Sequence, residues 1–135
     1  MNKIFYLSSV FKAAAEEDGS VTIEGMASTD SVDRVGDVVS ADAWTKSGGL
    51  NNYKKNPIIL FNHQYSKPIG KAVEIKTTPK GLYIKARISK ASGDVGELIK
   101  DGVLGAFSVG MRVKDAEYVK TTDGFLIKDA ELFEV

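Results

Sequence analysis

The stretch from Ile58 to Gly70, IILFNHQYSKPIG, joins an apolar run to His63, the only histidine in the chain. Pro57 precedes the run 58–61, in which apolar residues do not alternate with polar ones. Such a run is typical of a short strand that is buried on both faces. We therefore predict a strand that ends at Asn62, with the imidazole of His63 at its carboxyl end.

The residues that follow predict a β-hairpin. Segments 69–77 and 81–89 are joined by a stretch whose proline and glycine suit a tight turn, Thr78-Pro79-Lys80-Gly81. In the second segment apolar residues alternate with polar ones: Leu82, Ile84, Ala86 and Ile88. Upstream, an Asp-Gly turn at 18–19 predicts that segments 4–15 and 20–29 form another antiparallel pair.

Two short elements are expected between these hairpins. Residues 37–39 suit a short strand. Residues 40–47 predict a short helix, with Ser40 or Asp42 as its cap, Trp44 as its apolar anchor and two glycines at its end. Residues 51–56 are expected to form a polar loop.

The last third of the chain predicts one more helix and two longer strand regions. Residues 92–101 have helical periodicity, with Ser92 as the candidate N-cap and Gly102 just past the end. Strands are predicted over 104–119, interrupted around Lys114, and over 125–135. Together the elements predict a mainly β chain with a few short helices (α+β), built as a bent antiparallel β-barrel or a heavily bent sheet.

Composition narrows the functional classes. The 135 residues suit one domain with a sizeable core, and the formal net charge is zero, which offers no electrostatic attraction for nucleic acid or an anionic membrane. No apolar run is long enough to span a bilayer. The N-terminus is interpreted as a first strand, with a signal peptide as the second interpretation. Cysteine is absent and histidine occurs once, which excludes disulfides, thiol catalysis, cysteine-zinc sites and a two-histidine zinc site within the chain.

A second anchor is the stretch 104–112, LGAFSVGMR, which contains Ser108. On a strand, Phe107 would face the core while Ser108 and Gly110 would face the other way, on a surface of small residues with room for a substrate backbone. A serine hydroxyl becomes a nucleophile when a base takes its proton, and histidine is the usual base near neutral pH. His63 is the histidine that the chain offers.

An acid or another polar group must then orient the imidazole. Glu131 and Glu134 are the candidates near the C-terminus, and on a regular strand they would lie on opposite faces. Each residue also has a structural interpretation. A histidine at a strand end is often a hydrogen-bonded surface residue, and a serine between small residues often serves close packing.

Four patterns, in matching order and spacing, resemble the prohead maturation proteases of tailed bacteriophages, a family related in fold to herpesvirus assemblin. These are GMASTDSVDRVGDVVSADAW (Gly25–Trp44), ILFNHQYSKPIGKA (Ile59–Ala72), GLYIKARIS (Gly81–Ser89) and IKDGVLGAFSVGMRV (Ile99–Val113). The resemblance implies a bent antiparallel β-barrel of the herpesvirus-protease type. It also implies that residues 1–135 form a single prohead protease domain, with the family's C-terminal segment absent or truncated.

The resemblance also implies roles for individual residues. The family's base falls on His63, its nucleophile on Ser108 and its third member best on Glu134. Backbone groups near Val109 and Gly110 are candidates for holding the oxyanion, and the Arg112 side chain is a further electrostatic candidate. No metal or cofactor is needed for this chemistry.

The function implied is that of a serine endopeptidase acting during phage head maturation. Its expected substrates are the phage scaffold protein, the major capsid protein and, by autoproteolysis, itself. It would act in the host-cell cytoplasm, inside the assembling prohead, and a homo-oligomer is left open. The alternative is a catalytically silent β-barrel module that binds a capsid or scaffold partner. A small-molecule-binding barrel is less favoured, because no set of pocket-lining aromatic residues stands out.

Overall fold

The computed structural model describes residues 4–33 and 36–135 and is mostly β, as predicted. Its strands are β1 (Ile4–Val10), β2 (Lys12–Ala15), β3 (Val21–Thr29), β4 (Val38–Val39), β5 (Ile58–Leu60), β6 (Pro68–Thr78), β7 (Gly81–Ile88), β8 (Ala106–Val119) and β9 (Gly124–Glu134). Two short α-helices, α1 (Asn51–Lys55) and α2 (Asp94–Lys100), and a 3-10 turn, η1 (Lys90–Ser92), complete the fold.

The strands form two sheets. One has the order β1-β8-β9-β4 and the other the order β2-β3-β7-β6-β5. Neighbouring strands are antiparallel except β4 and β9, which are parallel. The predicted hairpin of β6 and β7 is confirmed, with Thr78 opposite Gly81 at its turn. The N-terminal residues from Ile4 onward form a strand, as expected.

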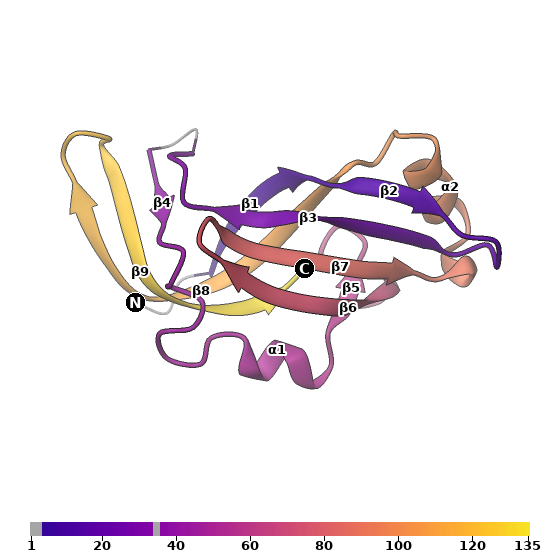
Figure 1. Cartoon of the computed structure of the whole chain (residues 1–135), viewed down its shortest axis with the longest axis horizontal. Helices are drawn as coiled ribbons and strands as arrows, with labels where there is room; N and C mark the ends of the chain where they lie inside the picture. Colours follow the sequence, from indigo (N-terminus) through magenta and orange to yellow (C-terminus); the bar gives the residue numbers. More distant parts are fainter. Residues whose placement is uncertain (1–3, 34–35) are drawn as a thin grey trace.

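The two sheets meet along two seams and so curl into a half-barrel (Figure 1). Along the first seam, β1 runs on into β2, and between them the Phe11 N–H donates to the Gly105 carbonyl at 3.0 Å. At the second seam, the Leu60 N–H at the end of β5 donates to the Val135 carbonyl at 2.9 Å. The second seam therefore brings the end of β5 beside the end of β9.

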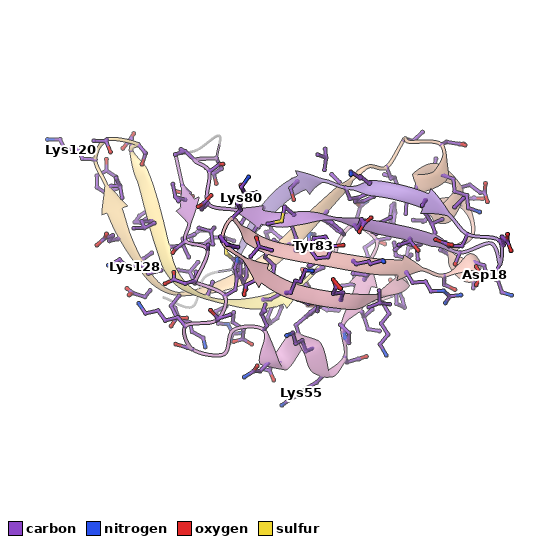
Figure 2. All side chains as sticks on the ribbon, in the orientation of Figure 1. Asp18, Lys55, Lys80, Tyr83, Lys120 and Lys128 are labelled. Atoms are coloured by element: carbon purple, nitrogen blue, oxygen red, sulfur yellow. The ribbon has the colours of Figure 1, made fainter. Side chains whose placement is uncertain are left out.

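The long β8–β9 hairpin projects beyond the curled region, with Lys120 at its tip, while Asp18 marks the opposite end of the molecule (Figure 2). The core lies between the curled sheets. The alternating residues of β7 that were predicted to be buried, Leu82, Ile84, Ala86 and Ile88, are all fully buried. Trp44 is also fully buried. Burial of such apolar area is the main source of stability in a domain of this size.

The helix predicted at 40–47 is wrong, because these residues form a succession of turns. The reason is a competing tertiary hydrogen bond. The Ala43 carbonyl accepts from the Ala130 N–H of β9 at 3.0 Å, so it is not available to a helical N–H four residues on. The loop predicted at 51–56 is wrong too, since helix α1 occupies it. Tyr53 is buried there, and its hydroxyl donates to the Ile58 carbonyl at 2.6 Å.

Segment 4–15 does not pair with 20–29 as one unit. Its first part, β1, pairs with β8, and only β2 pairs with β3. The helix predicted at 92–101 is confirmed over Asp94–Lys100, but Ser92 is not its N-cap. Ser92 belongs to the preceding 3-10 turn, and Gly93, at φ 65°, stands at the cap position. Gly102 follows the helix at φ 78°, as the pattern predicted.

Two strand predictions need adjustment. The interruption expected near Lys114 does not break β8, which runs on with a shift in register between Val113 and Asp115. Strand β5 is an edge strand rather than one buried on both faces. Only Ile59 is fully buried, whereas Ile58 and Leu60 are half-buried.

Candidate active site

Ser108 lies in β8 on the face that the sequence predicted. Phe107, Val109 and Met111 are buried in the core, with at most 3% of their surface exposed, whereas Ser108 and Arg112 are half-buried on the other face. Neighbouring strands hold β8 on both sides, with β1 pairing at Ser8 and β9 pairing from Gly110 onward. The backbone that carries the hydroxyl is therefore fixed by a ladder of hydrogen bonds.

His63 lies in a tight turn directly after β5. The Gln64 N–H donates to the Phe61 carbonyl at 3.0 Å, and the two central residues, Asn62 and His63, have φ values of 51° and 57°. Positive φ at both central positions is the mark of a type I′ turn. Asparagine and histidine are both enriched among the non-glycine residues that adopt this conformation, although it still costs a residue with a Cβ about 1 kcal/mol or more. Such strain is often found at functional sites.

The turn places the imidazole against the serine. His63 Nε2 lies 2.8 Å from Ser108 Oγ, which is hydrogen-bond distance across a sequence separation of 45 residues. With the imidazole proton on Nδ1, Nε2 is free to accept the proton of the serine hydroxyl. The sequence predicted that His63 and Ser108 act together, and the structure brings them into contact.

Glu134 is the acidic residue of the same cluster. It ends β9, is 6% exposed, and lies opposite Gly110 in the β8–β9 register. Its Oε1 is 2.9 Å from His63 Nδ1, a close contact that is not aligned as a full hydrogen bond. A Cβ at position 110 would lie 2.9 Å from Glu134 Cγ and 3.2 Å from Tyr6 Cε1. The glycine thus makes room for the glutamate.

The expectation that Glu131 and Glu134 lie on opposite faces is wrong. The register pairs Arg112 with Glu131 and Gly110 with Glu134, so one extra residue, Phe133, is inserted in β9. Paired residues share a face, and a bulge of this kind cancels the normal alternation. Both glutamates therefore lie on the face of Ser108. The two glutamates differ in what they contact. Glu134 contacts the imidazole, whereas Glu131 accepts a hydrogen bond from Asn52 Nδ2 at 3.2 Å.

Two tyrosines belong to the cluster and were missed from the sequence. The Tyr65 hydroxyl donates to Glu134 Oε2 at 2.7 Å, and this hydrogen bond raises the pKa of Tyr65 above its ordinary value. The Tyr6 ring packs edge-on against the His63 ring, with centroids 4.7 Å apart. Tyr65 comes two residues after His63, a local signal that was available. Tyr6 lies in β1 and reaches the site only through the fold.

The groups expected to hold the oxyanion are the backbone of Val109 and Gly110 and the side chain of Arg112. Val109 and Gly110 pair with Leu7 and Tyr6 of β1, respectively. The guanidinium carbon of Arg112 lies 5.5 Å from the centre of the Phe133 ring, and its Nε is buried without a hydrogen-bond partner. Among residues 4–33 and 36–135, no ion pair of Arg112 with a carboxylate is found.

The cluster has the composition of an acid–base and nucleophile site. The hydroxyl contacts the imidazole, and the imidazole contacts the carboxylate. This arrangement activates serine for acyl transfer. The described part of the chain contains no group of histidine, aspartate or glutamate side chains that could hold a metal ion. In that same part, no helix is long and apolar enough to cross a membrane.

Residues 9–135 match the family described as caudovirus prohead serine protease. The chain belongs to this family. It is 48% identical over 131 residues to the prohead protease of Escherichia phage T5, an alignment that covers 96% of this chain and 61% of that protein. It is 26% identical over 113 residues to the prohead protease of Enterobacteria phage HK97, covering 80% of this chain and 49% of that one. The family resemblance drawn from the four sequence patterns is confirmed.

Among solved structures, the fold is similar to that of the capsid assembly protease of bacteriophage T4. The TM-score is 0.67 with 12% sequence identity, and the match covers 98% of this chain and 95% of that one. At this identity the likeness concerns the fold alone, and it confirms the predicted bent β architecture. The chain spans about three-fifths of the length of the T5 protease and smaller shares of the other curated relatives.

Proposed function

We propose that this protein is a serine endopeptidase in which Ser108 is the nucleophile, His63 the general base and Glu134 the orienting acid. The observation that carries the proposal is the continuous contact from Ser108 Oγ to His63 Nε2 at 2.8 Å and from His63 Nδ1 to Glu134 Oε1 at 2.9 Å. Membership of a serine protease family supports the same assignment.

The reaction begins when Ser108 Oγ attacks a peptide carbonyl carbon while its proton passes to His63 Nε2. The carbonyl π electrons move to oxygen and form a tetrahedral oxyanion. The C–N bond then breaks, and the imidazolium gives its proton to the leaving amine, which leaves an acyl-enzyme. Water attacks the acyl carbon with His63 as base, and Ser108 departs with the returned proton.

The surrounding residues support this chemistry in distinct ways. Glu134 stabilises the imidazolium and keeps the proton of the neutral ring on Nδ1. Tyr65 holds the far oxygen of Glu134, and Tyr6 limits rotation of the imidazole by packing against it. Backbone N–H groups at Val109 and Gly110, together with the Arg112 side chain, are the proposed donors to the oxyanion.

The substrates that we propose are scaffold and capsid-protein segments of an assembling phage head, with self-cleavage as a further reaction. The names of relatives support this, since they include prohead proteases and a capsid polyprotein from Pseudomonas phage PAJU2, to which this chain is 26% identical over 136 residues. The site of action would then be the interior of the prohead in the host cell. A homo-oligomer is compatible with this setting.

The test is Ser108→Ala, co-expressed with the scaffold and capsid proteins of its own phage. We expect processing to be lost while the far-ultraviolet circular dichroism and the melting temperature stay near wild type, because the change removes one hydroxyl from a half-buried position. Ser8→Ala is the matched control, because Ser8 faces Ser108 across the β1–β8 pair. Processing by the Ser108 variant at the wild-type rate would exclude this serine as the nucleophile and favour a non-catalytic binding module.

A further inference from the structure

A cavity of about 330 Å³ opens beside the Ser108 hydroxyl and takes no part in the chemistry described above. Its walls come from the start of β8, the end of β5, helix α2 and the buried faces of β3 and β7. The side chains deepest in it are apolar and nearly fully buried: Ile23, Ile59, Ile88, Ile99 and Phe107. Half-buried Phe11, Val95 and Leu104 extend the apolar wall.

Among the described residues that line the cavity, the polar side chains are those of Asn62, His63 and Ser108. None of these lining residues is an aspartate, glutamate, lysine or arginine. A charged side chain placed inside it would lose its hydration without gaining an ion partner, and burial of an unpaired charge costs more free energy than burial of a neutral polar group. An apolar occupant gains free energy in proportion to the area it removes from water.

The size of the cavity is consistent with a large side chain. An engineered apolar cavity of about 150 Å³ is enough to bind benzene. The cavity beside Ser108 is roughly twice that volume, so it accommodates a leucine, methionine or phenylalanine side chain together with the adjoining backbone atoms.

We propose that this cavity binds a large aliphatic or aromatic side chain of the peptide substrate close to the scissile bond. The inference rests on the protease function proposed above and adds the substrate class to it. Ser108 and His63 both line the cavity, so a substrate residue seated there lies within a few residues of the attacked carbonyl. Filling the cavity also excludes water from the reacting atoms, which strengthens the electrostatic interactions of the site.

Ala106 offers a way to test the cavity without disturbing the core. It is the first residue of β8, it is exposed, and it contributes to the lining two residues before Ser108. Ala106→Phe should place an aromatic ring where the substrate side chain would lie. Ala14→Phe makes the same chemical change at an exposed position of β2 outside the cavity and serves as the control. Leu104→Ala enlarges the cavity and provides a second, opposite variant.

The experiment has two readouts on purified protein. A proteome-derived peptide library, digested by the wild type, reports which residues flank the cut. A fluorophosphonate with a small alkyl group reports whether Ser108 is reactive, without using the cavity. We expect leucine, isoleucine, methionine or phenylalanine to be enriched at one position within about three residues of the cut.

For a peptide with leucine at that position, we expect Ala106→Phe to lower kcat/KM by about tenfold or more, whereas Ala14→Phe leaves it within about twofold. Leu104→Ala should shift the preference toward larger aromatic residues. Fluorophosphonate labelling should be retained in all three variants.

Enrichment of charged residues at that position would overturn the cavity assignment and leave the protease function standing. Equal kcat/KM values for Ala106→Phe and Ala14→Phe, with Ser108 still labelled in both, would have the same meaning. If Ala106→Phe does not fold, an unchanged preference in Leu104→Ala has the same meaning. Absence of both labelling and cleavage in the wild type would overturn the protease function and this inference with it.

Discussion

The candidate site has two halves that are built in different ways. The strand half consists of Ser108, Gly110 and Glu134, which lie on the paired strands β8 and β9. The turn half consists of His63 and Tyr65, which lie between β5 and β6. The strand half is held by backbone hydrogen bonds, whereas the turn half is carried by a turn with two left-handed residues, Asn62 and His63, and reaches the site through side-chain contacts.

This difference indicates which changes the site can absorb. Strand residues cannot move without breaking ladder pairs, so an added atom there must displace a neighbouring side chain. The turn can relax more easily, because only three backbone hydrogen bonds hold residues 61–67: Gln64 N–H to the Phe61 carbonyl, Phe61 N–H to the Lys67 carbonyl and Lys67 N–H to the Gln64 carbonyl. We therefore expect steric changes to be more damaging in the strand half, and loss of single contacts to be milder in the turn half.

After loss of the nucleophile itself, the largest effect should come from the acid of the strand half. Glu134→Gln removes the charge that stabilises the imidazolium, so we expect kcat to fall by about 10³–10⁴-fold while cleavage stays detectable. Steady-state cleavage of a peptide substrate measures it. Glu131→Gln is the control, because that residue contacts Asn52 instead, and it should behave like wild type. If Glu131→Gln lost activity while Glu134→Gln kept it, Glu131 would be the acid that orients the imidazole.

A steric change in the strand half should come next. Gly110→Ala places a methyl group 2.9 Å from Glu134 Cγ and 3.2 Å from Tyr6 Cε1, so the glutamate must shift from its position beside His63. We expect kcat/KM to fall by about 10- to 100-fold, as small misplacements of catalytic groups can cause. The control is Gly105→Ala, where an added Cβ meets nothing within 4 Å. Equal activity of the two variants would contradict the close packing around Glu134.

The turn half should respond more weakly to the loss of a contact. Tyr65→Phe removes the hydrogen bond to Glu134 Oε2 from a residue that is 71% exposed, and we expect a fall in kcat of about threefold to tenfold. The hydrogen bond to that carboxylate raises the pKa of Tyr65 above the ordinary tyrosine value of 10.0, so the hydroxyl keeps its proton through pH 9. The ratio of wild-type to variant rates should therefore stay constant from about pH 7 to pH 9. A ratio that collapses across this range would show that the hydroxyl ionises there.

The smallest effect should be a change in stability at the turn itself. Asn62 has φ 51°, which glycine adopts without strain, whereas alanine meets a steric penalty. Asn62→Gly should leave the free energy of unfolding within about 0.5 kcal/mol of wild type, and Asn62→Ala should lower it by about 1 kcal/mol. Urea denaturation of both variants measures the difference. A more stable alanine variant would contradict the left-handed turn.

Sequence reasoning was most successful where the signal is local and repeated. Alternation in 81–89 and the turn at 78–81 predicted the β6–β7 hairpin, and the small face around Ser108 was confirmed. Periodicity also located helix α2. It did not predict the turns at 40–47, where the Ala43 carbonyl is taken by β9, or the helix at 51–55, where burial of Tyr53 outweighs the polar composition.

The sequence by itself determined a β-rich chain with one histidine, a serine on a small-residue face and an acidic C-terminal strand. Its four patterns also determined the family. Only the tertiary structure decided which glutamate contacts the imidazole. Regular alternation predicted Glu131 and Glu134 on opposite faces of the strand, but the extra residue at Phe133 cancels that alternation and places both on one face. Tyr6 and the apolar cavity likewise depend on strands far apart in the chain. Local periodicity describes which side of a strand a residue occupies, whereas the partners across a barrel are set by strand register and closure.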